Sequence, residues 1–136
     1  MDNKINTAGK LTHVDRSGQA SMVDVSEKKA STRRAIATGY IAMTSSTLAL
    51  IKANNVAKGD VLATARIAGI HGAQHCPTLI PLCHTLLLST VAVDFEIDDN
   101  NHRINIRCYC KLFGSISVYI EAWTGVSLAA LAISHW

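Results

Sequence analysis

Charged and aromatic residues are scarce in this chain of 136 residues: 17% are Asp, Glu, Lys or Arg, and 5% are Phe, Trp or Tyr. The formal net charge is +3, and no basic run is interleaved with aromatic residues, so no nucleic-acid partner is expected. No stretch approaches 18 consecutive apolar residues, so no membrane association is expected. The polar N-terminus lacks the apolar core of a secretion signal, and we therefore expect a cytoplasmic protein.

Apolar residues are abundant and indicate one folded domain. They make up 49% of the chain, and 136 residues are enough to bury a core. So much apolar surface on a small chain predicts that part of it lies in a subunit interface. We expect residues 1–20, with breakers at Gly9 and Gly18, to form a flexible arm, and residues 21–136 to form a single α+β domain.

The first half of the chain predicts a strand followed by two helices. Residues 33–44 alternate as a strand does, with Ile36, Tyr40 and Met43 as candidates for its buried positions. Thr44 is a good N-cap for a short helix after it, and Asp60 for a second helix over residues 61–75.

The second half predicts a hairpin and a final helix. Residues 86–97 and 103–112 alternate with period two on either side of a turn rich in Asp and Asn. Val91, Val93, Phe95 and Ile97 would share one face, and so would Ile104, Ile106, Cys108 and Cys110. Residues 118–136 are helical in composition. The order of these elements predicts an antiparallel sheet with helices packed on one face.

Cysteine and histidine raise the question of a metal site. Without an export signal, the four cysteines are expected to be reduced thiols, and Cys108 and Cys110 are typical small core residues. His71 and His75 lie four residues apart on one helical face, and with Cys76 and Cys83 they make a zinc-binding module an alternative. The spacing matches no standard set of zinc ligands, so we predict no metal.

The segment LIPLCH, residues 79–84, carries the strongest chemical signal. Histidine titrates near neutral pH and serves as an acid, a base or a ligand. The alternative is that His84 ends a buried segment and bonds a carbonyl. Arg33 and Lys58 are among the scattered cations that would hold phosphates if the fold gathered them, although each alone is typical of a solvated surface.

Four segments in order resemble one known family: THVDRSGQASMVDVSEK, KGDVLATARIAGI, LIPLCH and IEAWTGVSLAALAI. The chain resembles the cyclic pyranopterin monophosphate synthases, the MoaC family of molybdenum-cofactor biosynthesis, over about residues 11–133. The resemblance implies a lyase that converts 3′,8-cyclo-7,8-dihydro-GTP to cyclic pyranopterin monophosphate and releases pyrophosphate, without a metal or organic cofactor. It also implies a ferredoxin-like α+β subunit in a homo-oligomer, from a dimer to a hexamer, with active sites between subunits.

The resemblance also assigns roles to residues by position. It implies that Lys58 and His84 are catalytic. It implies contact with the triphosphate substrate, a pterin precursor derived from GTP, for a larger set: Leu82, Cys83, His84, Glu121, Arg33 and Asp24.

The family pattern is broken towards residue 136. His135 stands where the family has a catalytic aspartate, and the position of the family's following lysine lies beyond Trp136. Ser115 replaces a lysine and Tyr119 a glutamate. Loss of a base or a phosphate-binding cation costs orders of magnitude in rate. An alternative is therefore a catalytically impaired homologue that keeps the assembly and ligand-binding surfaces.

Overall fold

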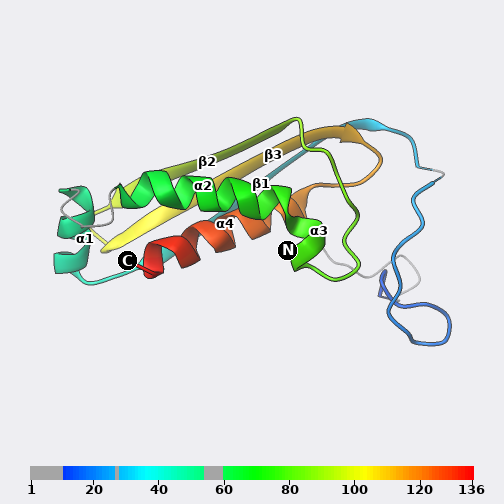
Figure 1. The fold of residues 1–136 in the computed structure, drawn as a ribbon, viewed down its shortest axis with the longest axis horizontal. Helices are drawn as coiled ribbons and strands as arrows, with labels where there is room; N and C mark the ends of the chain where they lie inside the picture. Colours follow the sequence, from blue (N-terminus) through cyan, green and yellow to red (C-terminus); the bar gives the residue numbers. More distant parts are fainter. Residues whose placement is uncertain (1–10, 27, 54–59) are drawn as a thin grey trace.

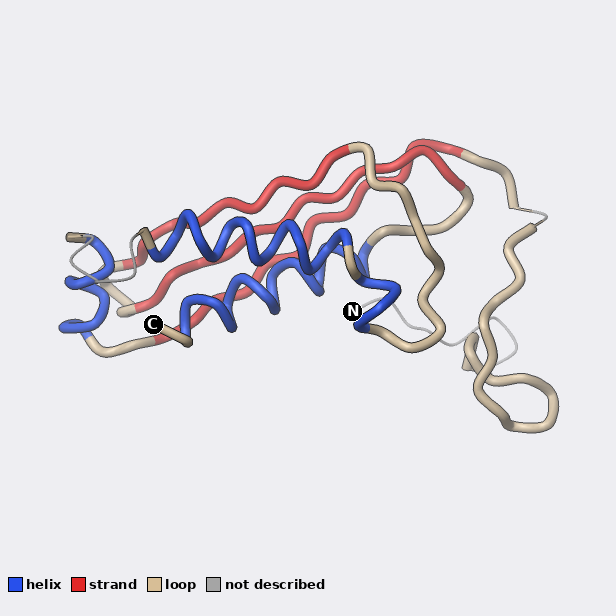
Figure 2. Tube along the Cα trace, in the orientation of Figure 1, coloured by secondary structure: helices blue, strands red, loops and turns tan. Residues whose placement is uncertain are grey.

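A three-stranded antiparallel sheet forms one layer of the protein, and the two longest helices cover one of its faces (Figures 1 and 2). The computed structural model describes residues 11–26, 28–53 and 60–136. The strands are β1 (Ser31–Ala42), β2 (Thr90–Asp98) and β3 (Arg103–Gly114), in the order β1-β3-β2. The predicted α+β arrangement is confirmed: among the described residues, one strand and three helices are followed by two strands and a final helix.

Of the four helices in the described parts of the chain, the first two begin after a residue whose side chain caps them. The four are α1 (Ser45–Lys52), α2 (Val61–Gln74), the short α3 (Cys76–Leu79) and α4 (Tyr119–Ser134). Thr44 accepts a hydrogen bond from the backbone N–H of Thr47 at 3.2 Å, and Asp60 accepts one from Ala63 at 3.0 Å. Both predicted N-caps are confirmed. In the described parts of the chain, no helix is long and apolar enough to cross a bilayer.

The core lies between the sheet and the pair α2 and α4. The predicted inward face of β3 is confirmed, since Ile104, Ile106, Cys108 and Cys110 are all buried. Glycine lets the two helices approach closely: a Cβ on Gly69 would lie 3.0 Å from the carbonyl oxygen of Gly125. Figure 1 shows that α2 and α4 run in opposite directions, so the start of one lies beside the end of the other.

The predicted buried positions of the first strand are wrong for Ile36 and Tyr40, whereas Met43, just after β1, does pack against the core. Ile36 and Tyr40 are 52% and 59% exposed, whereas Ala37 between them is buried. Both faces of this strand carry apolar side chains, but the helices of the described residues cover one face of the sheet, and Ile36 and Tyr40 lie on the other. The second strand also begins later than predicted, at Thr90 instead of residue 86.

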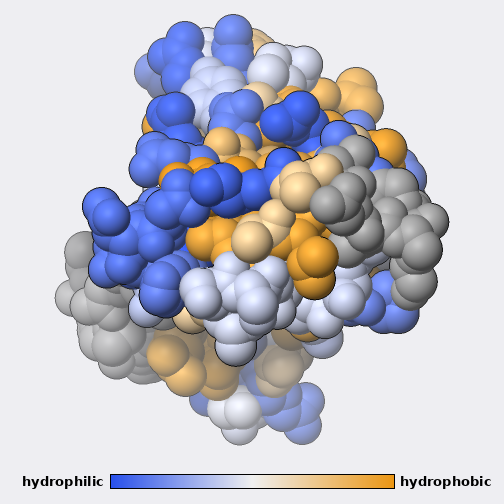
Figure 3. All heavy atoms as spheres, turned by 90° about the vertical axis from the view of Figure 1, so that its left-hand side faces the viewer, coloured by the Kyte–Doolittle hydropathy of each residue, from blue (hydrophilic) through white to orange (hydrophobic). Residues whose placement is uncertain are grey.

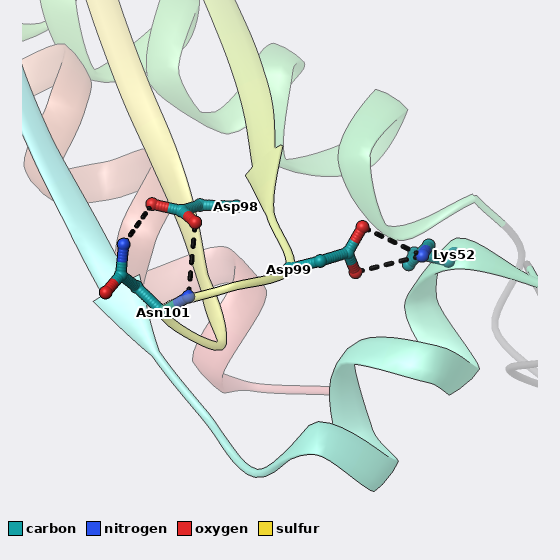
Figure 4. Close-up of polar contacts among 4 residues, drawn as sticks. All are labelled: Lys52, Asp98, Asp99 and Asn101. Atoms are coloured by element: carbon teal, nitrogen blue, oxygen red, sulfur yellow. Dashed lines mark hydrogen bonds and ion pairs between the residues drawn. The ribbon is translucent and has the colours of Figure 1, made fainter.

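The predicted hairpin between β2 and β3 is confirmed (Figure 4). Asp98 accepts hydrogen bonds from the backbone and the side-chain amide of Asn101, at 3.2 and 2.9 Å. Lys52 at the end of α1 reaches Asp99 in the same turn at 2.9 Å. An exposed ion pair of this kind contributes at most about 1 kcal/mol, so its main effect is to keep α1 beside the turn.

Candidate functional site

A pocket of about 210 Å³ lies where the loop after α3 meets the start of α4. The loop after α3 and the start of α4 form two walls of this pocket, and the segment that precedes β1 forms a third. Three sets of side chains from segments far apart in the sequence therefore face one space. Its lining residues are Thr12, His13, Val23, Val25, Lys28, Cys83, His84, Leu86, Ile116, Ser117, Tyr119, Ile120 and Glu121.

His84 is held at this pocket by a hydrogen bond to the chain before β1. Its Nε2 lies 2.9 Å from the carbonyl oxygen of Val23. A carbonyl only accepts, so Nε2 carries the proton, and Nδ1 is the basic nitrogen of the neutral ring. The histidine thus bonds a carbonyl and also keeps a nitrogen suited to proton transfer.

Glu121 is a buried acid in the first turn of α4. Only 3% of the residue is exposed, and this burial raises the pKa of its carboxyl above the usual value. The thiol of Cys83 donates towards Glu121 Oε2 at 3.8 Å. Burial, together with the neighbouring Cys76 and Glu121, raises the pKa of Cys83 to about 12. The pocket wall therefore favours the protonated form of two acidic groups.

The backbone turns sharply just before Cys83. Leu82 has a φ of 62°, in the left-handed region that bulky residues rarely adopt. After this turn, Cys83 Sγ lies 3.6 Å from the buried Sγ of Cys76 at the start of α3. All four cysteines are free thiols.

The structure brings together three of the predicted site residues and separates others. Cys83, His84 and Glu121 all line the pocket, whereas Leu82, Asp24 and Arg33 do not. Lys58 lies outside the described residues.

Asp24 and Arg33 are engaged in local contacts instead. The carboxylate of Asp24 is exposed and accepts the backbone N–H of Ser26 at 3.0 Å, which lowers its pKa. Arg33 donates to the carbonyl oxygen of Gly114 across the sheet at 3.2 Å. Both residues thus stabilise their own segments in a single chain.

Among the pocket residues that were not predicted, two carry side-chain nitrogens, His13 and Lys28. His13 lies in the wall, and its Nδ1 is buried without a hydrogen-bond partner among the described residues. Lys28 supplies a cation to the same wall. Both belong to the first segment of the resemblance, but no spacing rule distinguishes them from surface residues.

A second hollow lies at the opposite end of the molecule. α4 has 16 residues and α2 has 14, so they are about 24 and 21 Å long. His135 follows α4 at the end where α2 begins after Asp60 (Figure 1). Apolar atoms gather on this end of the surface (Figure 3), where Ile41, Met43, Leu50, Ile133 and Trp136 line a groove.

Comparison with known proteins identifies the family of the chain. The MoaC family matches residues 22–135. The cyclic pyranopterin monophosphate synthases of Brucella ovis, Brucella canis and Brucella suis are each 48% identical to the chain over 126 residues. These alignments cover 93% of this chain and 76% of each relative. The chain belongs to the MoaC family. Its LIPLCH segment and the first turn of α4 form one side of the pocket in this MoaC protein.

The alternative zinc module of His71, His75, Cys76 and Cys83 does not assemble in this MoaC family member. Both histidines are exposed, and Nδ1 of His75 lies 2.8 Å from the carbonyl oxygen of His71 in the preceding turn of α2. The groups that do meet are Cys76, Cys83 and Glu121. Helical spacing places the two histidines on one face, as expected. The loop after α3, however, directs Cys83 towards Glu121 of α4 and not towards the histidines.

Burial of Glu121 predicts a stability difference that depends on pH. The carboxyl of Glu121 keeps its proton to a higher pH in the folded chain than in the unfolded chain. Between the usual glutamate pKa of 4.5 and the raised pKa of the folded chain, folding stability therefore falls as pH rises. Glu121→Gln removes the titration and should gain stability relative to wild type with rising pH, by about 1.4 kcal/mol for each unit by which the pKa is raised.

Urea unfolding of both proteins between about pH 4 and pH 8 measures this difference. Glu96→Gln, on an exposed position of β2, is the matched control. A constant or reversed difference for Glu121→Gln would contradict the assignment of Glu121 as a buried acid whose pKa is raised in the folded chain.

Proposed function

We propose that this chain is a cyclic pyranopterin monophosphate synthase, a lyase of molybdenum-cofactor biosynthesis that releases pyrophosphate from 3′,8-cyclo-7,8-dihydro-GTP. The observation that carries the proposal is the pocket at which Cys83, His84 and Glu121 meet. These residues belong to the LIPLCH and IEAW segments of the resemblance, and the Brucella relatives carry the name of this activity.

The pocket has the groups that such a rearrangement needs. Opening one ring and closing a cyclic phosphate require proton transfers, and His84 offers Nδ1 beside the carboxyl of Glu121, whose pKa burial raises. Lys28 in the pocket wall offers a cation for the triphosphate. We assign proton transfer to His84, and substrate contact to Cys83 and Glu121.

The complete site is shared between two copies of the chain. The pocket with His84 lies at the end of the subunit where α2 ends and α4 begins, whereas Asp60 and His135 lie at the other end. Within one chain, these ends are separated by the length of the two helices. We therefore assign the catalytic Lys58, two residues before Asp60, to the site of a neighbouring copy, and Arg33, Asp24 and Leu82 to support of the substrate-binding surface.

A homo-oligomer, from a dimer to a hexamer, follows from this division. The uncovered face of the sheet supports it, because Ile36, Tyr40 and Phe113 expose 52%, 59% and 71% of their surface there. Apolar side chains gathered on a sheet face are typical of a surface that a partner covers. We propose a cytoplasmic enzyme that acts on a small molecule and needs neither nucleic acid nor a membrane.

The alternative function is binding without chemistry. His135 in place of the family's aspartate favours it, since imidazole places its nitrogen differently from a carboxylate oxygen, and position decides the rate. Such a subunit would keep the fold and the oligomer and hold the substrate without converting it.

Incubation of the purified chain with 3′,8-cyclo-7,8-dihydro-GTP tests the proposal. A synthase forms pyrophosphate and cyclic pyranopterin monophosphate in equal amounts. Substrate binding measured by calorimetry without either product would favour the alternative. Absence of both binding and products would overturn both functions.

A further inference from the structure

Two thiols and a carboxyl meet beneath the pocket, in a cluster that the proposed reaction does not use as a unit. Cys76 Sγ lies 3.6 Å from Cys83 Sγ, and Cys83 Sγ lies 3.8 Å from Glu121 Oε2. One ligand atom from each of the three residues lies within 4.8 Å of the other two. Thiolates and a carboxylate are a donor set that zinc binds in proteins.

The spacing of these atoms is close to that of a zinc coordination shell. Zinc–sulfur bonds of about 2.3 Å and zinc–oxygen bonds of about 2.0 Å, at tetrahedral angles, place two sulfurs about 3.8 Å apart and a sulfur and an oxygen about 3.5 Å apart. The observed separations of 3.6 and 3.8 Å differ from these values by only a few tenths of an ångström. The third pair, Cys76 and Glu121, lies within 4.8 Å, so side-chain rotations that bring these two groups together would complete the shell.

The fold holds the three groups in place before any ion binds. Cys76 is fully buried at the start of α3, and Glu121 is 3% exposed in the first turn of α4. The left-handed backbone of Leu82 turns Cys83 back towards both. A preformed arrangement on two helix starts and a tight turn lowers the ordering cost of metal binding.

The charges around the cluster leave a role for a cation. Among the described residues, the salt bridges are Lys52–Asp99 and Arg103–Asp98, and neither reaches Glu121. Burial raises the pKa of both Cys83 and Glu121, and the neighbouring Cys76 and Glu121 raise the pKa of Cys83 further. A bound dication would replace the thiol protons and stabilise the anionic forms that the empty cluster disfavours.

We propose that Cys76, Cys83 and Glu121 form a zinc-binding site whose fourth position opens into the pocket. Cys83 and Glu121 line the pocket, whereas Cys76 lies behind them. Three protein ligands and one open position are typical of zinc sites that accept water or a ligand oxygen. The site is a binding activity additional to the proposed function, and it does not depend on turnover.

Zinc titration of the reduced, chelator-treated full chain tests this site. We expect one Zn²⁺ per chain after desalting, measured by elemental mass spectrometry. With Co²⁺ as the probe, we expect thiolate-to-metal charge-transfer bands that Zn²⁺ abolishes. Cys83→Ser and Cys76→Ala should each weaken binding by at least about 100-fold, and Glu121→Gln by about 10–100-fold.

Two controls separate this cluster from other donors. Cys108→Ala removes a buried thiol that lies outside the cluster, and His75→Ala removes an exposed histidine of α2. Both should leave the affinity for zinc unchanged. If Cys76→Ala fails to fold, Cys83→Ser, at a half-buried position, and the cobalt spectrum of the wild type still decide.

A reduced wild-type chain that binds no stoichiometric zinc would overturn the proposal. Loss of binding in His75→Ala, or a cobalt spectrum without thiolate bands, would overturn it as well. These measurements contain no substrate, so their failure leaves the synthase proposal intact. Conversely, an inactive chain that binds one zinc would support this site alone.

Discussion

Replacing His84 with alanine is expected to lower the turnover of the chain by about 10²–10⁴-fold, the usual contribution of a positioned acid or base. The ring lies at the pocket, and its Nε2 is bonded to the carbonyl of Val23 at 2.9 Å. That bond keeps Nδ1 as the basic nitrogen. Pyrophosphate release from the cyclised GTP substrate measures the loss, and KM should change far less than kcat.

His71→Ala and His75→Ala are the matched controls for this variant. Both residues are exposed on α2, away from the pocket lining, so each variant should turn over as the wild type does. A His84→Ala variant that keeps wild-type kcat would remove the histidine from the chemistry. It would leave His84 only the role of tying its loop to Val23.

Replacing His135 with aspartate is expected to raise turnover by at least about 100-fold, the lower range of what a positioned base contributes. The resemblance places the family's catalytic aspartate at this position, directly after α4. The wild-type chain should correspondingly be slower than the Brucella ovis synthase by a similar factor. Steady-state rates of pyrophosphate release for the three proteins, measured side by side, check both expectations.

His102→Asp controls for an added carboxylate elsewhere. His102 lies in the hairpin turn with a φ of 49°, a conformation that aspartate tolerates. This variant should not gain activity. If His135→Asp stays as slow as the wild type, Ser115 and Tyr119 limit the site as well, and the impaired homologue becomes the better description.

Local rules were sufficient for most of the fold. The N-caps at Thr44 and Asp60 depend on a side chain and an N–H three residues later, so sequence alone identifies them. The hairpin follows from two alternating segments around a turn rich in Asp and Asn. The face of β1 could not be predicted in this way, because Ile36 and Ala37 are both apolar and only the position of the helices decides which is buried.

The candidate site was predicted in part, for similar reasons. Cys83 and His84 are adjacent in sequence, and the resemblance pointed to Glu121. Their meeting with Cys76 depends on the left-handed turn at Leu82 and on the end of α2, and neither has a periodic signature. His13 enters the pocket through the long-range placement of the segment before β1, which no local pattern indicates.

The central claim, that one working site is built from opposite ends of two copies, is tested most directly by mixing inactive variants. Lys58→Ala and His84→Ala chains are co-expressed so that they assemble together, and pyrophosphate release is measured. Each variant alone should be nearly inactive. In random mixtures, a site has both intact residues in one case out of four, so the account predicts roughly a quarter of wild-type turnover. Activity of the mixture no higher than that of either variant alone would contradict it.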